Sequence, residues 1–148
     1  MIIYRHTQTV PQEMLIGFGL LGGVGTLMTP GGLKALVGLS VAGLLATFRC
    51  LTVEVSHSKI SLEFGYWYNA INVDVDNISF CNPIRLNPLS GWGIHYIGGG
   101  WLYNVYGLGA VEVVMRNGKR CYIGTDEPEL LSAAIKEAIL RSSVEAAA

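Results

Sequence analysis

Hydrophobic and polar residues are distributed differently in the two parts of this chain. Residues 14–48 are almost wholly apolar, with Lys34 as their one charged side chain, and Thr29-Pro30-Gly31-Gly32 interrupts them near the middle. Proline cannot continue a helix, and glycine favours turns. The pattern therefore predicts two apolar helices within residues 11–50, joined by a turn at 29–32.

Each predicted helix is apolar on every side and long enough to approach the thickness of a bilayer. Eighteen helical residues span roughly 27 Å, and a bilayer core is roughly 30 Å thick. A helix that is hydrophobic all round is typical of a membrane span or of a buried core. We therefore expect a transmembrane helical hairpin, with a buried hairpin of a water-soluble protein as the alternative.

Charges beside the apolar stretch predict its orientation. Arg5 precedes the first helix and Arg49 follows the second, whereas Lys34 lies beside the turn. Positively charged flanks favour the cytoplasmic side of a membrane. The sequence therefore predicts a protein of the inner (cytoplasmic) membrane with both termini in the cytoplasm.

Small residues recur at helical spacing in both predicted helices. Gly19 and Gly23 are four residues apart in the first helix, and Ala42 and Ala46 are four apart in the second. Small residues at this spacing allow two helices to approach closely. They are candidates for helix–helix packing, although membrane helices are also rich in glycine for other reasons.

From residue 51 the chain consists of short alternating segments. Leu51, Val53 and Val55 alternate with polar residues, and similar segments recur as far as Ile123. Alternation of this kind predicts half-buried strands, and Asn117-Gly118 is a strong hairpin-turn signal. We expect about seven antiparallel strands in this region.

The last segment predicts an amphipathic helix. Asp126 is a possible N-cap, Pro128 suits the first turn, and Glu129 lies three residues after the cap. Apolar residues then recur at helical spacing: Leu130, Leu131, Ala134, Ile135, Ala138 and Ile139. Such a stripe has to cover apolar surface, and the preceding sheet supplies it.

These elements together predict an α+β fold. The expected architecture is an N-terminal transmembrane helical hairpin followed by a pleckstrin-homology-like (PH-like) split β-barrel with a C-terminal capping helix. The expected boundaries are an N-terminal segment at 1–10, the hairpin at 11–50, the PH-like domain at 51–142 and a tail at 143–148.

The chain also resembles a family of small bacterial membrane proteins in which two transmembrane helices precede a bacterial PH-like domain. The motifs that carry the resemblance are Leu51-Thr52-Val53-Glu54-Val55, Gly91-Trp92-Gly93-Ile94, Tyr103-Asn104-Val105 with Gly107, and Ile123-Gly124-Thr125 before Pro128-Glu129-Leu130. The activity of that family is largely uncharacterised. The resemblance therefore implies a fold and a membrane setting, and it implies no catalytic residue.

Composition narrows the function classes. The chain has 148 residues and a formal net charge of −1, whereas a domain that binds nucleic acid broadly is normally basic. Its three cysteines, Cys50, Cys81 and Cys121, are far apart and form no CxxC motif. Free thiols in a reducing compartment are expected, and nucleic acid is not an expected partner.

No familiar catalytic motif occurs in the sequence. The histidines are isolated, and His95 is expected to be a strand or loop residue, with a ligand or acid–base role as the alternative. Asp74 and Asp76 share a strand face, which favours solvated carboxylates over a metal pair. We expect no catalytic residue, cofactor or metal site, and hence a protein that is not an enzyme.

Aromatic and basic residues are the candidate contacts. They are the aromatic run Tyr66, Trp67 and Tyr68, the glycine-flanked Trp92 and Trp101, and the cations Arg116, Lys119 and Arg120 around the Asn117-Gly118 turn. The cations could meet lipid headgroups or an acidic partner, and the aromatic residues could anchor at a membrane, fill a partner's groove or pack at the barrel mouth.

Three functions are compatible with this sequence. The first is a non-enzymatic, membrane-anchored PH-like binding or scaffold module at the cytoplasmic face. The second is a small accessory or assembly subunit of a larger integral-membrane complex. The third is a lipid or small-ligand binder that uses the barrel mouth near Trp92 and Trp101.

Overall fold

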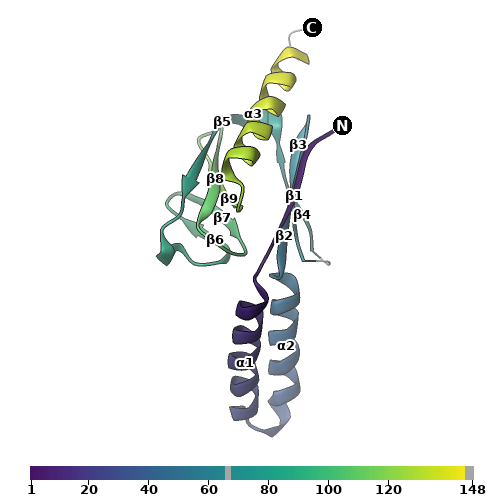
Figure 1. Cartoon of the computed structure of the whole chain (residues 1–148), viewed down its shortest axis with the longest axis vertical. Helices are drawn as coiled ribbons and strands as arrows, with labels where there is room; N and C mark the ends of the chain where they lie inside the picture. The colour runs from purple at the N-terminus through teal and green to yellow at the C-terminus, as the bar shows by residue number, and fades with distance from the viewer. Residues whose placement is uncertain (66–67, 146–148) are drawn as a thin grey trace.

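Two β-sheets and three α-helices make up the described part of the chain, which covers residues 1–65 and 68–145 in a computed structural model (Figure 1). The first sheet has four strands in the order β1-β2-β3-β4, and the second has five in the order β5-β8-β9-β7-β6. Short 3-10 helices η1 (Gly31–Leu33), η2 (Val75–Asn77) and η3 (Pro88–Ser90) lie between the larger elements.

The first sheet is an antiparallel meander interrupted by two helices. Its strands are β1 (Ile2–Thr9), β2 (Cys50–Ser56), β3 (Lys59–Phe64) and β4 (Tyr68–Asp74). The apolar residues that alternate along β2, namely Leu51, Val53 and Val55, are buried, whereas Thr52 and Glu54 between them are partly exposed. This period of two places one face of β2 in the core.

The second sheet is mixed rather than antiparallel throughout. Its strands are β5 (Ile78–Arg85), β6 (Gly93–Ile97), β7 (Gly100–Asn104), β8 (Gly109–Met115) and β9 (Arg120–Gly124). β7 and β9 pair in parallel, with Trp101 opposite Cys121. The turn between β8 and β9 contains Gly118 at φ +81°, a conformation that glycine adopts without strain.

The core lies between the two sheets, and α3 (Pro128–Glu145) covers it (Figure 1). Leu131 and Ile135 of α3 are fully buried together with residues of both sheets, such as Leu62 and Val111. Leu130, which the stripe of apolar residues also contains, is 58% exposed. The helix predicted after Asp126 is therefore present, and it buries a narrower stripe than the sequence indicated.

The helices α1 (Gln12–Met28) and α2 (Lys34–Thr47) form an antiparallel pair inserted between β1 and β2 (Figure 1). Because β1 and β2 are paired neighbours, the inserted segment leaves the sheet and returns to it at one point. The Val10 amide donates to the Arg49 carbonyl there, at 2.9 Å. We call the two helices the α1–α2 pair, and Figure 1 shows that it extends away from both sheets.

The predicted fold class was wrong in its arrangement. The chain begins with the strand β1 rather than with a helical hairpin, and the described strands form sheets of four and five rather than about seven antiparallel strands of a split barrel. The reason is that β1 pairs with β2 along Ile2–Thr9. In the sequence, one of these two strands precedes the helices and the other follows them.

The predicted transmembrane character was also wrong. Within the described residues, no helix combines the length and the apolarity that crossing a membrane requires, and α1 and α2 have 17 and 14 residues. The predicted two membrane spans, the inner-membrane location with cytoplasmic termini and the lipid-headgroup contacts therefore lose their basis.

Helices α1 and α2 approach each other through Gly22. A side chain at Gly22 would collide with Val41 of α2, and Thr26 lies beside Gly38 one turn further along. A side chain at Gly19 or Gly23 would meet nothing within 4 Å, and Ala42 and Ala46 are exposed. The small residues singled out from their spacing therefore lie on faces that the pair leaves open.

The three cysteines are free and buried, in agreement with the prediction from their spacing. Burial raises the pKa of the Cys121 thiol to about 12 and also raises that of Cys81. Thiolates are the reactive form of cysteine. At pH 8, Ellman's reagent should therefore detect fewer than one thiol per folded chain, and all three thiols per chain in denaturant. Full reaction of the native chain at the unfolded rate would contradict this packing.

Candidate functional site

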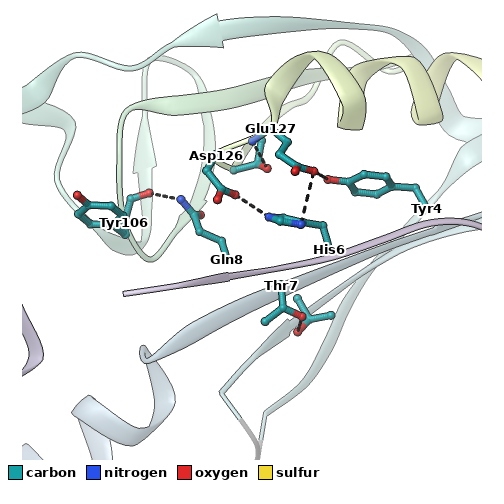
Figure 2. A network of polar contacts seen from close by, with 9 residues as sticks. Tyr4, His6, Thr7, Gln8, Tyr106, Asp126 and Glu127 are labelled. Atoms are coloured by element: carbon teal, nitrogen blue, oxygen red, sulfur yellow. Dashed lines mark hydrogen bonds and ion pairs between the residues drawn. The ribbon is translucent and has the colours of Figure 1, made fainter. Parts of the chain in front are cut away.

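One face of β1 presents polar side chains to the start of α3 (Figure 2). Tyr4, His6 and Gln8 alternate along the strand, so all three project from the same face. Figure 2 shows Tyr4 and His6 pointing toward Asp126 and Glu127, which immediately precede the helix, and Gln8 bonded to Tyr106. This polar face joins the first residues of the chain to a segment about 120 residues later.

His6 lies between two carboxylates. Its Nε2 is 2.7 Å from Oδ1 of Asp126, and its Nδ1 is 3.5 Å from Oε2 of Glu127. Both ring nitrogens therefore face acceptors within the protein. These two contacts hold β1 against the segment that precedes α3.

Tyr4 extends the same network. Its hydroxyl donates to Oε2 of Glu127 at 3.3 Å. Burial of the phenol, together with the neighbouring Glu127 charge, raises the pKa of Tyr4 from 10 to about 12. Both causes favour the neutral phenol over the phenolate.

This raised pKa predicts an alkaline dependence of stability. Because the pKa is higher in the folded state, the contribution of Tyr4 is complete below pH 10 and is lost as the pH rises from about 10 to 12. Tyr4→Phe should therefore lose less stability than the wild type over that range in urea unfolding. Cys121 titrates in both proteins, so their difference isolates Tyr4; parallel curves would contradict the assignment.

Gln8 is fixed by a loop of the second sheet. Its Nε2 donates to the carbonyl of Tyr106 at 2.8 Å. That loop is held by the fully buried Asn104, which accepts from the Tyr106 amide and donates to the Gly107 carbonyl. Gly107 has φ +81°, which a side chain would make unfavourable.

The amide oxygen of Gln8 has no hydrogen-bond partner among the described residues, although the side chain is only 4% exposed. Gln8 and Asp126 line the same cleft. A buried amide oxygen without a donor costs about 1–3 kcal/mol. This atom is therefore an acceptor in need of a donor.

A cleft of about 730 Å³ lies beside this polar face. Its volume is in the range of small-ligand sites, roughly 300–1,000 Å³. Gln8 of β1, Arg85 at the end of β5, the loop around Tyr106, Asp126 just before α3 and Glu129 in its first turn line it. The lining therefore combines the side-chain oxygens of Gln8, Asp126 and Glu129 with a single cation, Arg85.

The lining of this cleft supplies hydrogen-bond acceptors and one cation. In the described part of the chain, no group of three or more His, Cys, Asp or Glu side chains is arranged to hold a metal ion. The ring nitrogens of His6 face Asp126 and Glu127. The arrangement offers fixed acceptors to a ligand that carries N–H or O–H donors.

A second candidate surface is the α1–α2 pair itself. No residue of α1 or α2, both fully described, is buried. Eleven large apolar side chains between residues 12 and 48 are exposed by 39–81%: Ile16, Phe18, Leu20, Leu21, Val24, Leu27, Met28, Leu33, Leu36, Leu39 and Leu44. Contiguous apolar surface of this size marks an interaction site or an aggregation liability.

The predicted aromatic contacts lie in separate places. Trp92 contacts Phe18 of α1 edge-on, with ring centroids 5.9 Å apart, and lines an apolar cleft of about 300 Å³ at the base of the pair. Trp101 instead pairs edge-on with Tyr96, at 6.0 Å. Trp92 and Trp101 therefore lie in two different places and do not share the barrel mouth that the sequence led us to expect. Tyr66 and Trp67 lie outside the described residues, and Tyr68 begins β4.

The predicted basic contacts lie at the exposed turn between β8 and β9. Arg116, Lys119 and Arg120 are all exposed. Arg120 is bound to Glu112 of the neighbouring strand at 3.2 Å. Lys119 and Arg120 also line a groove with Trp101. One of the three cations thus has a partner within the sheet.

Comparison with known proteins gives no family for this chain. No family model matches it, and no curated protein matches it significantly. Together with the strand at the N-terminus and the absence of a membrane-spanning helix from the described residues, this overturns the resemblance to the bacterial PH-like membrane family.

The polar face of β1 was missed from the sequence. A local signal existed, because Tyr4, His6 and Gln8 alternate with Ile3, Arg5 and Thr7 as the residues of a strand do. The partners Asp126 and Glu127 could not be found in the same way, since nothing local indicates which strand lies against the start of a distant helix.

Proposed function

We propose that this chain is a non-enzymatic binding module that joins a larger protein assembly as an accessory subunit. The observation that carries the proposal is that the α1–α2 pair is almost wholly apolar and yet buries none of its residues. The two sheets and α3 form the folded base that holds the pair.

Covering the α1–α2 pair would stabilise an assembly substantially. Burying a partly exposed Leu or Ile side chain is worth on the order of 1 kcal/mol, so eleven give on the order of 10 kcal/mol. Association itself costs roughly 4–15 kcal/mol. The apolar surface is therefore of the size that supports a specific complex, provided that the partner covers most of it.

The occupant we propose is a different protein with an apolar groove. Leu20 and Leu21 are consecutive in α1 and project about 100° apart, yet they are 68% and 72% exposed. A flat contact with a second copy of the chain would cover only one of these two leucines and leave the other exposed. The charges on the two helices are few, Glu13 and Lys34, so the groove needs no charged complement.

Site-specific photocrosslinking tests this proposal. A photoreactive phenylalanine analogue placed at Leu20 or Leu36 in cells of the source organism should give an adduct of one discrete mass larger than a dimer. The same analogue at Leu140 of α3, which is 67% exposed, is the matched control and should give no such adduct. A dimer-sized adduct, equal labelling at all three positions or no adduct at Leu20 and Leu36 would overturn the proposal.

The apolar cleft beside Trp92 favours a second candidate, the binding of a small apolar ligand. Leu15, Phe18 and Phe48 line it together with Trp92 and Val105. Bromobenzene should then quench the fluorescence of Trp92 saturably, because a heavy atom in contact with the indole is required. The quenching should disappear in Trp92→Phe and persist in Trp101→Phe; quenching that is linear and equal in both would reject this candidate.

A further inference from the structure

We propose that the cleft between β1 and the start of α3 binds an alkylammonium group, which Gln8, Asp126 and Glu129 receive through their oxygens. This site is separate from the α1–α2 pair and does not depend on the function proposed for the pair. The ammonium can belong to a free amine or to a lysine side chain of another protein.

The recessed acceptor identifies the ligand as a donor. Gln8 is 4% exposed, its Nε2 is bound to the Tyr106 carbonyl, and its Oε1 lacks a partner among residues 1–65 and 68–145. Exchanging the two amide atoms would direct the oxygen at the Tyr106 carbonyl, so the hydrogen bond fixes the orientation. An ammonium carries three donors and no acceptor, which suits an acceptor oxygen in a cleft that carboxylates also line.

Charge on the cleft wall favours the same ligand. Asp126 lies two residues before α3 and Glu129 lies in its first turn, and both line the cleft. In the described chain Glu129 makes no ion pair, whereas Asp126 is bound to His6. The single cation of the lining, Arg85, comes from the end of β5. A compact cation with an apolar tail suits this lining, because Ile84 and Leu108 also belong to it.

The acceptors are fixed before a ligand arrives. Gln8 is held by the Tyr106 loop, which the buried Asn104 braces, and Asp126 is held by His6. Groups that are already oriented lose little conformational freedom when a ligand binds.

An NMR titration of the full chain tests the proposal. Butylammonium chloride should shift the side-chain amide of Gln8 and the backbone amides of residues 106–109, 125–127 and 129 saturably, with one dissociation constant. Butanol and sodium butyrate share the alkyl tail but lack the ammonium group, so they should not shift these amides saturably. The proposal fails if butylammonium gives no saturable shift, or if butanol or butyrate gives the same shifts.

Variants locate the binding group. Glu129→Gln removes an exposed charge and should weaken butylammonium binding about threefold, whereas Glu137→Gln, further along α3, should not change it. Gln8→Met should weaken it about tenfold, since a hydrogen bond to a charged group is lost. Should Gln8→Met fail to fold, Glu129→Gln against Glu137→Gln decides: equal constants would overturn the assignment.

The source of the ammonium is resolved by a second ligand. Nα-acetyl-lysine amide presents the same group on a protein-like backbone. Binding at least as tight as that of butylammonium identifies a lysine side chain as the ligand, and weaker binding identifies a free amine. Both results support the site. If this compound shifts only residues that lie outside the cleft, the site is contradicted.

Discussion

Gly124→Ala should lower the free energy of unfolding by about 3 kcal/mol. A methyl group at Gly124 would collide with the side chain of Asn104, which is fully buried and braces the loop beside Gln8. Overpacking costs about 1–3 kcal/mol, and breaking the buried hydrogen bonds of Asn104 costs about 1–3 kcal/mol more. Urea unfolding measures the change directly.

Gly43→Ala is the matched control for this prediction. A side chain at Gly43 of α2 would meet nothing within 4 Å. Alanine is favoured over glycine in a helix by about 1 kcal/mol, so Gly43→Ala should leave stability unchanged or raise it by up to that amount. Equal effects of the two substitutions would mean that Gly124 is not packed against Asn104.

The combined variant Leu20→Gln, Leu27→Gln and Leu36→Gln should lose binding to the assembly partner. Each of these side chains is 62–73% exposed in the isolated chain. Losing three buried apolar contacts in the complex removes about 4 kcal/mol, which raises the dissociation constant about 1,000-fold. Calorimetric titration with the partner identified by crosslinking measures this constant.

The fold itself should tolerate those three substitutions. Because the side chains are exposed, the free energy of unfolding should change by less than about 1 kcal/mol. The control is Leu130→Gln, Leu140→Gln and Val144→Gln on α3, whose side chains are 58–68% exposed. This control should bind as the wild type does. Loss of binding in both variants would point to apolarity in general rather than to the α1–α2 pair.

Local pattern was a sound guide to the elements that bury one face. Alternation predicted strands such as β2 and β3, Asn117-Gly118 predicted the turn between β8 and β9, and helical spacing predicted α3. These signals are local because the burial of alternate residues depends only on which face meets the core. The pairing of β1 with β2 and of β7 with β9 joins segments separated by other elements, and no local signal reports it.

Apolar composition was a poor guide to the environment of α1 and α2. A stretch such as residues 14–48 indicates that its side chains favour an apolar neighbour, and it does not identify the neighbour. In the structure the two helices are short, follow a strand and lie beside one another away from the sheets. The spacing of small residues also did not identify the face of α1 that contacts α2, since Gly22 rather than Gly19 or Gly23 lies against α2.

The candidate site was predictable only in fragments. Trp92 was singled out because it lies between glycines, and it does line a cleft against α1. The polar face of β1 was not singled out, because His6 and Gln8 acquire their partners only when β1 lies against residues 104–127. Isolated histidines in a sequence therefore say little about whether carboxylates surround them in the fold.

Carbene footprinting of the assembly purified from the source organism tests the central claim most directly. Labelling of Ile16, Leu20, Leu27 and Leu36 should fall several-fold relative to the isolated chain, while labelling of Leu130 and Leu140 stays the same. If α1 and α2 are labelled equally in both samples, or if α3 is protected in their place, then the α1–α2 pair is not the surface by which this protein binds its partner.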